Sequence, residues 1–152
     1  MHIANAIAAN VTVVCSVGND YTDVERYPAC FNGVIGVGAV DNEKDLTGYT
    51  NESKALDIVA PAGDDGFGQM YILRPTTTDS DGYGYSDGTS YATPQVAATV
   101  AMMLSLNPSL TPAQILSRLK SRSTESVKGI LTEKTYPLLN VGKSVALTDD
   151  TW

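Results

Sequence analysis

The 152-residue chain is long enough to bury a core of its own, and its length alone predicts a single domain. Its composition, with 43% hydrophobic and 18% charged residues, is ordinary for a soluble globular protein, and no apolar run reaches the length of a membrane span. The formal net charge of −7 at pH 7, with lysine and arginine scattered along the chain, argues against nucleic acid as a partner.

The first third of the chain reads as one helix end followed by three strands. Apolar residues in 3–10 recur at helical spacing and predict the last turns of a helix. Residues 11–17 are β-branched and almost wholly apolar, which predicts a strand covered on both faces of a parallel sheet. A second such strand is expected at 33–40, where three glycines indicate close packing against the backbone. A third, at 56–60, is stopped by Pro61.

The middle of the chain predicts a hairpin and then a helix. Residues 62–88 hold clusters of Gly, Asp and Thr, and we interpret them as a surface β-hairpin because a structureless loop of that length is unusual in a compact domain. The apolar run 96–104 has no polar face, which predicts a helix buried on all sides. Pro94 supports a helix start close to Ser90, since proline is tolerated near a first turn.

Ser90 is placed by this pattern at the mouth of the helix. Backbone N–H groups there have no helical partner and the helix dipole is positive, which favours an anion on or near the Ser90 oxygen. This is a suitable position for a nucleophile. The alternative is that Ser90 caps the helix, which is the commoner role of a serine at such a position.

The last third of the chain predicts two further helices. Residues 111–114, Thr-Pro-Ala-Gln, are typical of a capping box with proline at the first helical position, and an apolar stripe follows at 115–119. The tail 121–137 is polar and is expected to be irregular, and a short final helix is expected near Leu139.

The two cysteines and the single histidine form no recognisable ligand cluster. Cys15 lies in an apolar run and Cys30 stands apart from it without a CxxC motif, so two buried free thiols are favoured. A disulfide between them or a metal site is the alternative. His2 is interpreted as a surface or tag-adjacent residue, and no secretory signal pattern is visible before the first helix.

Five segments carry a resemblance to a known family. They are 13–20 (VVCSVGND), 27–29 (YPA) with 34–41 (VIGVGAVD), 56–61 (LDIVAP), 88–94 (GTSYATP), and Asn107-Pro108 with the helix after it. In this order and spacing they resemble the C-terminal half of a subtilisin-like serine protease, or subtilase, over residues 3–147.

The resemblance implies a partial three-layer α/β fold of the subtilisin type. Residues 1–152 would form a single partial domain with the C-terminal strands of a parallel sheet, flanking helices, a buried helix starting at Ser90 and a β-hairpin within 62–88. The N-terminal portion, which carries the catalytic Asp and His in the family, is absent from the matched region.

The resemblance also implies serine-type endopeptidase chemistry through an acyl-enzyme. Ser90 would attack the scissile carbonyl, and the side-chain amide of Asn19 would donate a hydrogen bond to the oxyanion that forms. A serine hydroxyl needs a base to take its proton and an acid to orient that base, and His2 lacks the sequence context of the family's base. The chain alone is therefore expected to be inactive.

Two other functions are weighed against this one. A pseudoprotease or peptide-binding module would keep the cleft without catalysis, and it could retain both Ser90 and Asn19. An esterase lacks support because no Gly-x-Ser-x-Gly elbow surrounds Ser90.

Substrate recognition is implied for a second set of residues. Ser16, Val17 and Gly18 would form one wall of the pocket for the side chain that precedes the cut. Arg26 would lie near the floor of that pocket, where its guanidinium would favour an acidic side chain through a bidentate pair. The alternative is that Arg26 points to solvent.

The resemblance requires no cofactor for the chemistry, and it leaves a structural calcium or monovalent cation as an option. Asp41 matches a position that helps to bind a cation in some members, and the alternative is that it forms a turn. Expected partners are a protein or peptide substrate and the missing N-terminal half. The exposed edge of strand 11–17 and one side of the Ser90 helix also invite self-association. Because subtilases are often secreted, the resemblance implies an extracytoplasmic location.

Overall fold

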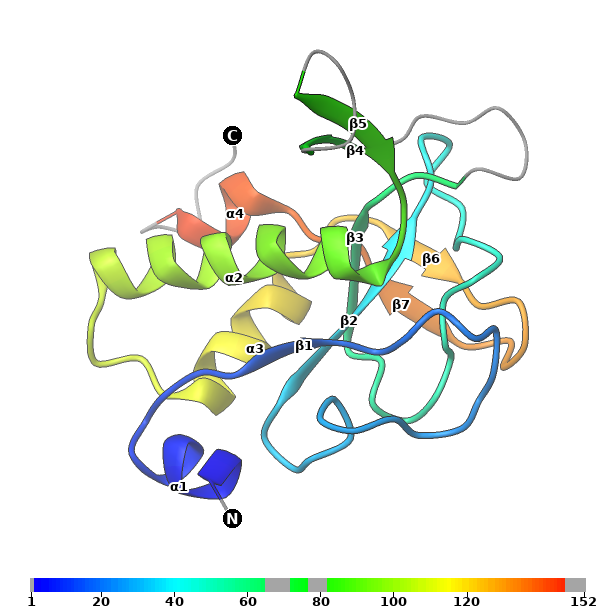
Figure 1. Ribbon diagram of the computed structural model, residues 1–152. Helices are drawn as coiled ribbons and strands as arrows, with labels where there is room; N and C mark the ends of the chain where they lie inside the picture. Colours follow the sequence, from blue (N-terminus) through cyan, green and yellow to red (C-terminus); the bar gives the residue numbers. More distant parts are fainter. Residues whose placement is uncertain (1, 65–71, 77–81, 147–152) are drawn as a thin grey trace.

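The computed structural model describes residues 2–64, 72–76 and 82–146 (Figure 1). Within this part of the chain, no helix combines the length and the apolar character that a bilayer span requires. The elements in chain order are α1 (His2–Ala8), β1 (Val14–Ser16), β2 (Ile35–Val40), β3 (Ile58–Pro61), β4 (Ile72–Pro75), β5 (Tyr83–Ser86), α2 (Thr89–Leu106), α3 (Pro112–Ser121), β6 (Ser126–Lys128), β7 (Thr135–Pro137) and α4 (Val141–Val145).

The predicted parallel sheet is confirmed, with strand order β1-β2-β3. Val14 pairs with Ile35, and Val37 pairs with Ile58, so the three strands run in the same direction. β1 is shorter than the predicted strand, because its pairing with β2 begins at Val14 opposite Ile35, where β2 starts, and the chain turns away at Gly18 after Ser16 has paired with Val37. Among the described residues β1 is paired on its β2 side alone, which makes it an edge strand.

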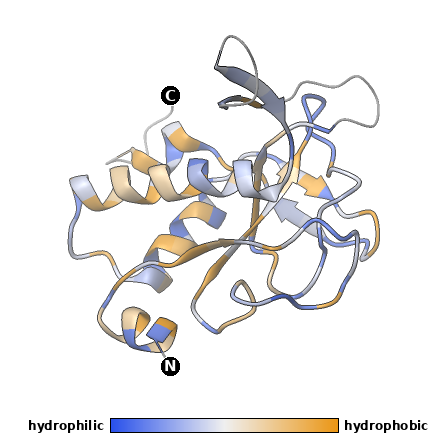
Figure 2. Ribbon diagram, in the orientation of Figure 1, coloured by the Kyte–Doolittle hydropathy of each residue, from blue (hydrophilic) through white to orange (hydrophobic). Residues whose placement is uncertain are grey.

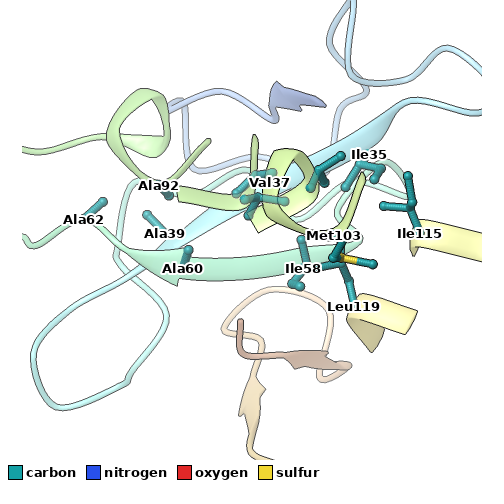
Figure 3. Packing of buried hydrophobic residues seen from close by; sticks show 12 residues of the cluster. Ile35, Val37, Ala39, Ile58, Ala60, Ala62, Ala92, Met103, Ile115 and Leu119 are labelled. Carbon is teal, nitrogen blue, oxygen red and sulfur yellow. The ribbon is translucent and has the colours of Figure 1, made fainter. Parts of the chain in front are cut away.

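One face of the sheet is covered by α2, α3 and α4, and it holds the larger core cluster (Figure 1). Alternate residues of β2 and β3 point toward these helices, as the two-residue period of a strand requires. Figure 3 shows their side chains meeting those of α2 and α3. The buried residues of this cluster are Ile35, Val37, Ala39, Ile58, Ala60, Ala62, Ala92, Val96, Val100, Met103, Ile115 and Leu119.

The opposite face of β2 is open at two glycines, and the chain before β3 fills the space. A Cβ at Gly36 would collide with the carbonyl oxygen of Ala55, and a Cβ at Gly38 would lie 2.7 Å from the side chain of Leu56. The predicted close packing against this strand is therefore confirmed. The smaller core cluster on this side consists of Val17, Ala29, Val40, Leu46, Leu56, Val59, Val127 and Tyr136.

Helix α2 is buried on the face toward the sheet and exposed on the face away from it. The buried residues are Thr89, Ala92, Val96, Thr99, Val100 and Met103. The exposed residues on the other face include Ser90, Pro94, Ala97, Ala98, Ala101 and Met102. Periodicity predicted burial on all sides because both faces are built from small or apolar residues, and Figure 2 shows hydrophobic colouring through the C-terminal turns. The exposed side agrees with what the family resemblance implied.

The predicted hairpin is β4–β5, in which Leu73 lies opposite Tyr85. The rest of the predicted hairpin segment, residues 65–71 and 77–81, lies outside the described residues. The expectation of an irregular tail was wrong, because β6 and β7 form a second hairpin with Val127 opposite Tyr136. In each of these three-residue strands only the middle residue is buried, so no period-2 pattern is long enough to detect.

The remaining predicted elements are present. α3 begins at Pro112 with the complete capping box formed by Thr111 and Gln114. α4 begins at Val141, two residues after the expected start, with Asn140 as its N-cap. Both cysteines are free, and each is half-buried rather than fully buried. His2 is exposed on α1, away from the start of α2 (Figure 1).

Candidate active site

Ser90 lies in the first turn of α2 and its side chain is exposed. The N-cap of the helix is Gly88, and no side chain caps the helix, so Ser90 does not have the capping role that was the alternative. Among the described residues no backbone carbonyl accepts the Ser90 N–H. The serine therefore stands where an unpaired amide and the positive end of the helix dipole coincide.

Gly88 shapes the turn that delivers Ser90 to this position. Its φ is 121°, a region that favours glycine, and a Cβ there would lie 3.1 Å from Nδ2 of Asn19. The Gly88 N–H donates to the hydroxyl of Tyr49 at 3.0 Å, and that hydroxyl donates to the Gly63 carbonyl at 2.6 Å. Burial raises the pKa of Tyr49 to about 12, so its hydroxyl stays protonated and can donate at neutral pH.

Asn19 meets the residue that precedes Ser90. Its Oδ1 accepts hydrogen bonds from the backbone N–H of Thr89 at 3.0 Å and from the Thr89 hydroxyl at 2.7 Å. These two bonds fix the orientation of the carboxamide and leave Nδ2 next to Gly88. In the described part of the chain nothing accepts a hydrogen bond from Nδ2. The structure thus brings Asn19 to the turn that precedes Ser90, with its Nδ2 donor unoccupied next to Gly88.

A shallow depression adjoins Ser90 on the side of β1. It is lined by Val14, Cys15, Ser16, Pro28, Ser90, Thr93 and Pro94. Ser16 therefore joins Ser90 at one surface. Val17 differs, because its side chain is only 1% exposed and belongs to the smaller core cluster. Gly18 adopts a φ of 103°, which turns the chain from β1 toward Asn19.

Arg26 is neither isolated nor fully solvated. Its Nε lies 3.2 Å from a carboxylate oxygen of Asp20, and both side chains are about half exposed. A hydrogen bond from Asn51 and the charge of Arg26 hold the pKa of Asp20 below its usual range. Any acidic group that approaches Arg26 therefore competes with a carboxylate already present.

Asp41 forms a turn. One carboxylate oxygen accepts the backbone N–H groups of Glu43 and Asp45, each at 2.9 Å. Across the described ranges, no group of three or more His, Cys, Asp or Glu side chains could hold a metal ion. The local geometry of Asp41 fits the turn-forming alternative.

The position of this site within the fold matches a general rule. Asn19 follows the carboxyl end of β1, and ligands of open α/β sheets bind outside the carboxyl ends of parallel strands. A larger cavity of about 550 Å³ opens near residues that precede β2 and β3, including Cys30, Ala55 and Asp57. It shares no lining residue with the depression beside Ser90.

Two contributors to this site were missed by sequence reasoning. Tyr49 bonds to Gly88, which is 39 residues away in the chain, and Asn51 bonds to Asp20 across 31 residues. Neither contact leaves a local pattern, because a turn residue of either type looks the same in a sequence whether or not it touches a distant loop. Thr89 was part of the quoted motif, but its bond to Asn19 was not anticipated.

A model of the subtilase family matches residues 2–139. Subtilisin DY from Bacillus licheniformis is 32% identical over 126 residues, which cover 80% of this chain and 43% of that protein. The major intracellular serine protease of Bacillus subtilis (strain 168) is 32% identical over 149 residues, covering 95% of this chain and 41% of its own length. A solved protease structure from Pseudoalteromonas arctica PAMC 21717 has a TM-score of 0.80 at 28% identity and covers 94% and 44% of the two chains. This chain spans less than half the length of each of these proteins.

Proposed function

The chain belongs to the subtilase family, and we propose that it supplies the nucleophile and an oxyanion donor of a serine endopeptidase. Ser90 is the proposed nucleophile, and Asn19 is the proposed side-chain donor. The observation that carries the proposal is the pair of hydrogen bonds from Thr89 to Asn19 Oδ1, which hold the free amide of Asn19 beside the start of α2.

The chemistry follows from where charge develops. Attack of the Ser90 oxygen on a peptide carbonyl forms a tetrahedral intermediate, and the carbonyl oxygen becomes negative. Nδ2 of Asn19 and the N–H of Ser90 are two fixed donors that this oxygen can accept from. Because they are already oriented, they stabilise the transition state more than the ground state. The family needs no cofactor for this reaction.

A general base must come from outside the described site. The only histidine in the sequence is His2, which is exposed on α1. We therefore propose that the chain alone does not turn over substrate and that the base and its orienting acid belong to a complementary half-domain. The free edge of β1 and the exposed face of α2 support this partner, as does the chain's coverage of under half of its relatives. The same surfaces support self-association when that half is absent.

The proposed specificity rests on Arg26 and on a wall formed by Ser16, Gly18 and the backbone of Val17, whose side chain is buried in the smaller core cluster. The pairing of Arg26 with Asp20 limits the expected preference for an acidic side chain before the cut, since that side chain would have to displace or share the guanidinium. Profiling the assembled enzyme on a peptide library tests this proposal. Equal cleavage after acidic and neutral residues would remove Arg26 from the specificity set.

The proposed cellular compartment rests on the family alone. Extracytoplasmic location is proposed only through the common secretion of subtilases. The Bacillus subtilis relative is named as an intracellular protease, so membership of the family is compatible with either compartment.

The main test uses a fluorophosphonate probe on the catalytic domain assembled from this chain and a subtilase N-terminal half that carries the Asp and His. We expect labelling of the wild-type assembly, no labelling of Ser90→Ala, and unchanged labelling of Ser105→Ala, a matched exposed serine on the same helix. Labelling that persists in Ser90→Ala would refute the nucleophile assignment. A peptide ligand that binds the assembly without labelling or cleavage would favour the peptide-binding alternative.

Asn19→Asp gives a sharper test of the oxyanion donor. The carboxylate keeps the oxygen that Thr89 bonds, but it replaces the amide donor with a negative charge. Loss of one such donor in subtilisin lowers kcat by about 10²–10³, and we carry that magnitude over from subtilisin to this chain. The expected result is a fall of this size in kcat with a small change in KM. Retention of full kcat would exclude Asn19 from the oxyanion site.

A further inference from the structure

The loop that carries Asn19 is fastened by one buried carboxamide, that of Asn51. This side chain is fully buried, with a relative exposure of 0%. Its Oδ1 accepts the backbone N–H of Asp20 at 2.8 Å and that of Thr22 at 3.3 Å. Its Nδ2 donates to the Val17 carbonyl and to an oxygen of the Asp20 carboxylate, both at 3.1 Å. The contacts therefore lie on both sides of Asn19 along the chain.

The backbone next to Asn51 reinforces this contact. The N–H of Asn51 donates to the Gly18 carbonyl at 3.2 Å. A Cβ at Gly18 would lie 2.5 Å from Nδ2 of Asn51, and the φ of Gly18 is 103°. Glycine is thus required at this position both by the backbone angle and by the closeness of the Asn51 amide. The main chain before Asn19 rests directly on the buried side chain.

The same short segment also reaches the turn that precedes Ser90. The Tyr49 carbonyl accepts the N–H of Tyr21 at 3.1 Å, while its hydroxyl accepts the N–H of Gly88 at 3.0 Å. Residues 49–51 therefore hold the Asn19 loop and the Ser90 turn from a single piece of backbone. The Asn19 loop and the Ser90 turn lie far apart in sequence, and they meet through this segment and through the Thr89–Asn19 bonds.

We propose that Asn51 is a positioning residue that fixes the Asn19 amide relative to Ser90. This inference rests on the proposed function for its catalytic consequence, while its structural part concerns the placement of Asn19 alone. A donor contributes to catalysis only when it is oriented before the charge forms, and a misplacement of about 1 Å can lower a rate by about 10²-fold. Asn51 is fully buried and does not line the depression beside Ser90, so its proposed effect is exerted through the 17–22 loop.

The first experiment uses the chain alone and measures amide hydrogen exchange by NMR. Asn51→Ala is expected to lower the protection of the Thr89 N–H at least about tenfold, although Asn51 makes no bond to Thr89. Amides of the β2–β3 ladder, such as Asp57 N–H bonded to Gly36, serve as the internal reference and should keep their protection. Asn140→Ala is the matched control, because it removes another carboxamide that bonds the backbone at a remote helix cap.

The second experiment measures kinetics in the assembled domain. Asn51→Ala is expected to lower kcat about 10²-fold with KM changed less than about twofold, since ground-state binding does not need the oxyanion donor. Asn51→Asp keeps both accepted hydrogen bonds but sets a second carboxylate against Asp20. Adding Asp20→Asn restores an amide opposite that carboxylate, so the double variant should recover at least about tenfold of the lost kcat.

The outcomes separate the two proposals. If the assembled wild-type domain shows no Ser90-dependent labelling, the proposed function fails, and the exchange of the Thr89 amide still decides whether Asn51 holds Asn19 in place. Unchanged Thr89 protection in a folded Asn51→Ala chain would overturn the positioning role. A loss of protection shared equally by the reference amides, or reproduced by Asn140→Ala, would likewise reduce Asn51 to a general stabilising residue and overturn it.

Discussion

The two faces of α2 have similar residues and opposite surroundings. The face toward the sheet carries side chains such as Val96 and Met103, which are buried. The outward face carries Ala97, Ala98 and Ala101, which are also apolar, and these are exposed. The difference shows that an apolar sequence pattern predicts burial of a surface, but it does not predict which polypeptide segment buries it. The outward face is the part of the fold that the described residues leave uncovered.

The largest expected effect comes from placing a charge on each face. Ala92→Asp puts a carboxylate into the core cluster with no cation to pair with, and should cost more than about 4 kcal/mol of unfolding free energy. Ala101→Asp on the outward face should change the stability of the chain alone by less than about 0.5 kcal/mol.

Urea denaturation of the two variants measures this contrast in stability, and a binding assay with the proposed complementary half-domain measures the contrast in surface contact. Ala101→Asp should abolish that binding although the chain remains folded. Tight binding by the Ala101→Asp variant would show that the outward face is not the contact surface.

Two neighbouring methionines give the next contrast. Met103 is 2% exposed and Met102 is 41% exposed, so one sequence step separates the two environments. Met103→Ala leaves a cavity in the core and should cost about 3 kcal/mol, whereas Met102→Ala should cost less than about 0.5 kcal/mol. Thermal or urea unfolding checks both variants, and equal losses would mean that the outward face is already covered in solution, for instance by a second copy.

A buried charged residue outside α2, Glu52, gives the third contrast with the outward face, because its relative exposure is 1%. Although burial raises its pKa, hydrogen bonds from the backbone of Leu131, Ile130 and Thr132 and from the Thr132 hydroxyl hold that pKa below its ordinary value of 4.5. A lowered pKa in the folded state gives stability that is present above pH 4.5 and is lost as pH falls through the folded-state value.

Glu52→Gln should therefore cost about 2 kcal/mol at pH 7 and should flatten the loss of stability on acidification. Denaturation at a series of pH values measures both effects. The exposed residues on the outward face of α2 include no titratable side chain. Uncharged substitutions on that face should therefore leave the dependence of stability on acid pH unchanged. An unchanged acid profile in Glu52→Gln would assign the sensitivity to another carboxylate.

The smallest contrast concerns helix propensity. Ala98→Gly on the outward face should cost about 1 kcal/mol, because it loses only the conformational preference of alanine for a helix. Ala92→Gly should cost about 2 kcal/mol, because it also removes a buried methyl group. Equal costs, measured by urea unfolding, would indicate that Ala98 too is packed against something.

Sequence patterns predicted the parts of the fold that are regular and locally encoded. The β-branched runs gave the parallel sheet, and the Thr111–Gln114 capping box located α3 to the residue. The β6–β7 hairpin was missed because each strand buries a single residue, which carries no periodic signal. The exposed side of α2 was recognised only through the family resemblance, since the residues themselves read as buried.

The candidate site was predictable to a similar extent. Ser90 was predicted from its place at a helix start together with the family resemblance, and Asn19 from the resemblance alone; the structure joins Asn19 to the turn before Ser90 through Thr89. The roles of Tyr49 and Asn51 were not accessible, because they depend on hydrogen bonds that cross more than 30 residues. Such contacts are set by how loops are stacked on the sheet, and a single sequence does not report that stacking.

Because Gly36 and Gly38 have no Cβ, the loop before β3 can lie in direct contact with the backbone of β2. That loop includes Thr50 and Ala55, which touch these glycines, and Asn51 lies between them in the chain. One methyl group added at Gly36 would push the Ala55 carbonyl, and the loop with it, away from the strand, and we expect the proposed oxyanion donor Asn19 to move through its link to Asn51. The spacing of the proposed reacting groups, Asn19 and Ser90, would then depend on two glycines in the middle of the sheet, where a substitution is expected to lower activity with both of those side chains intact.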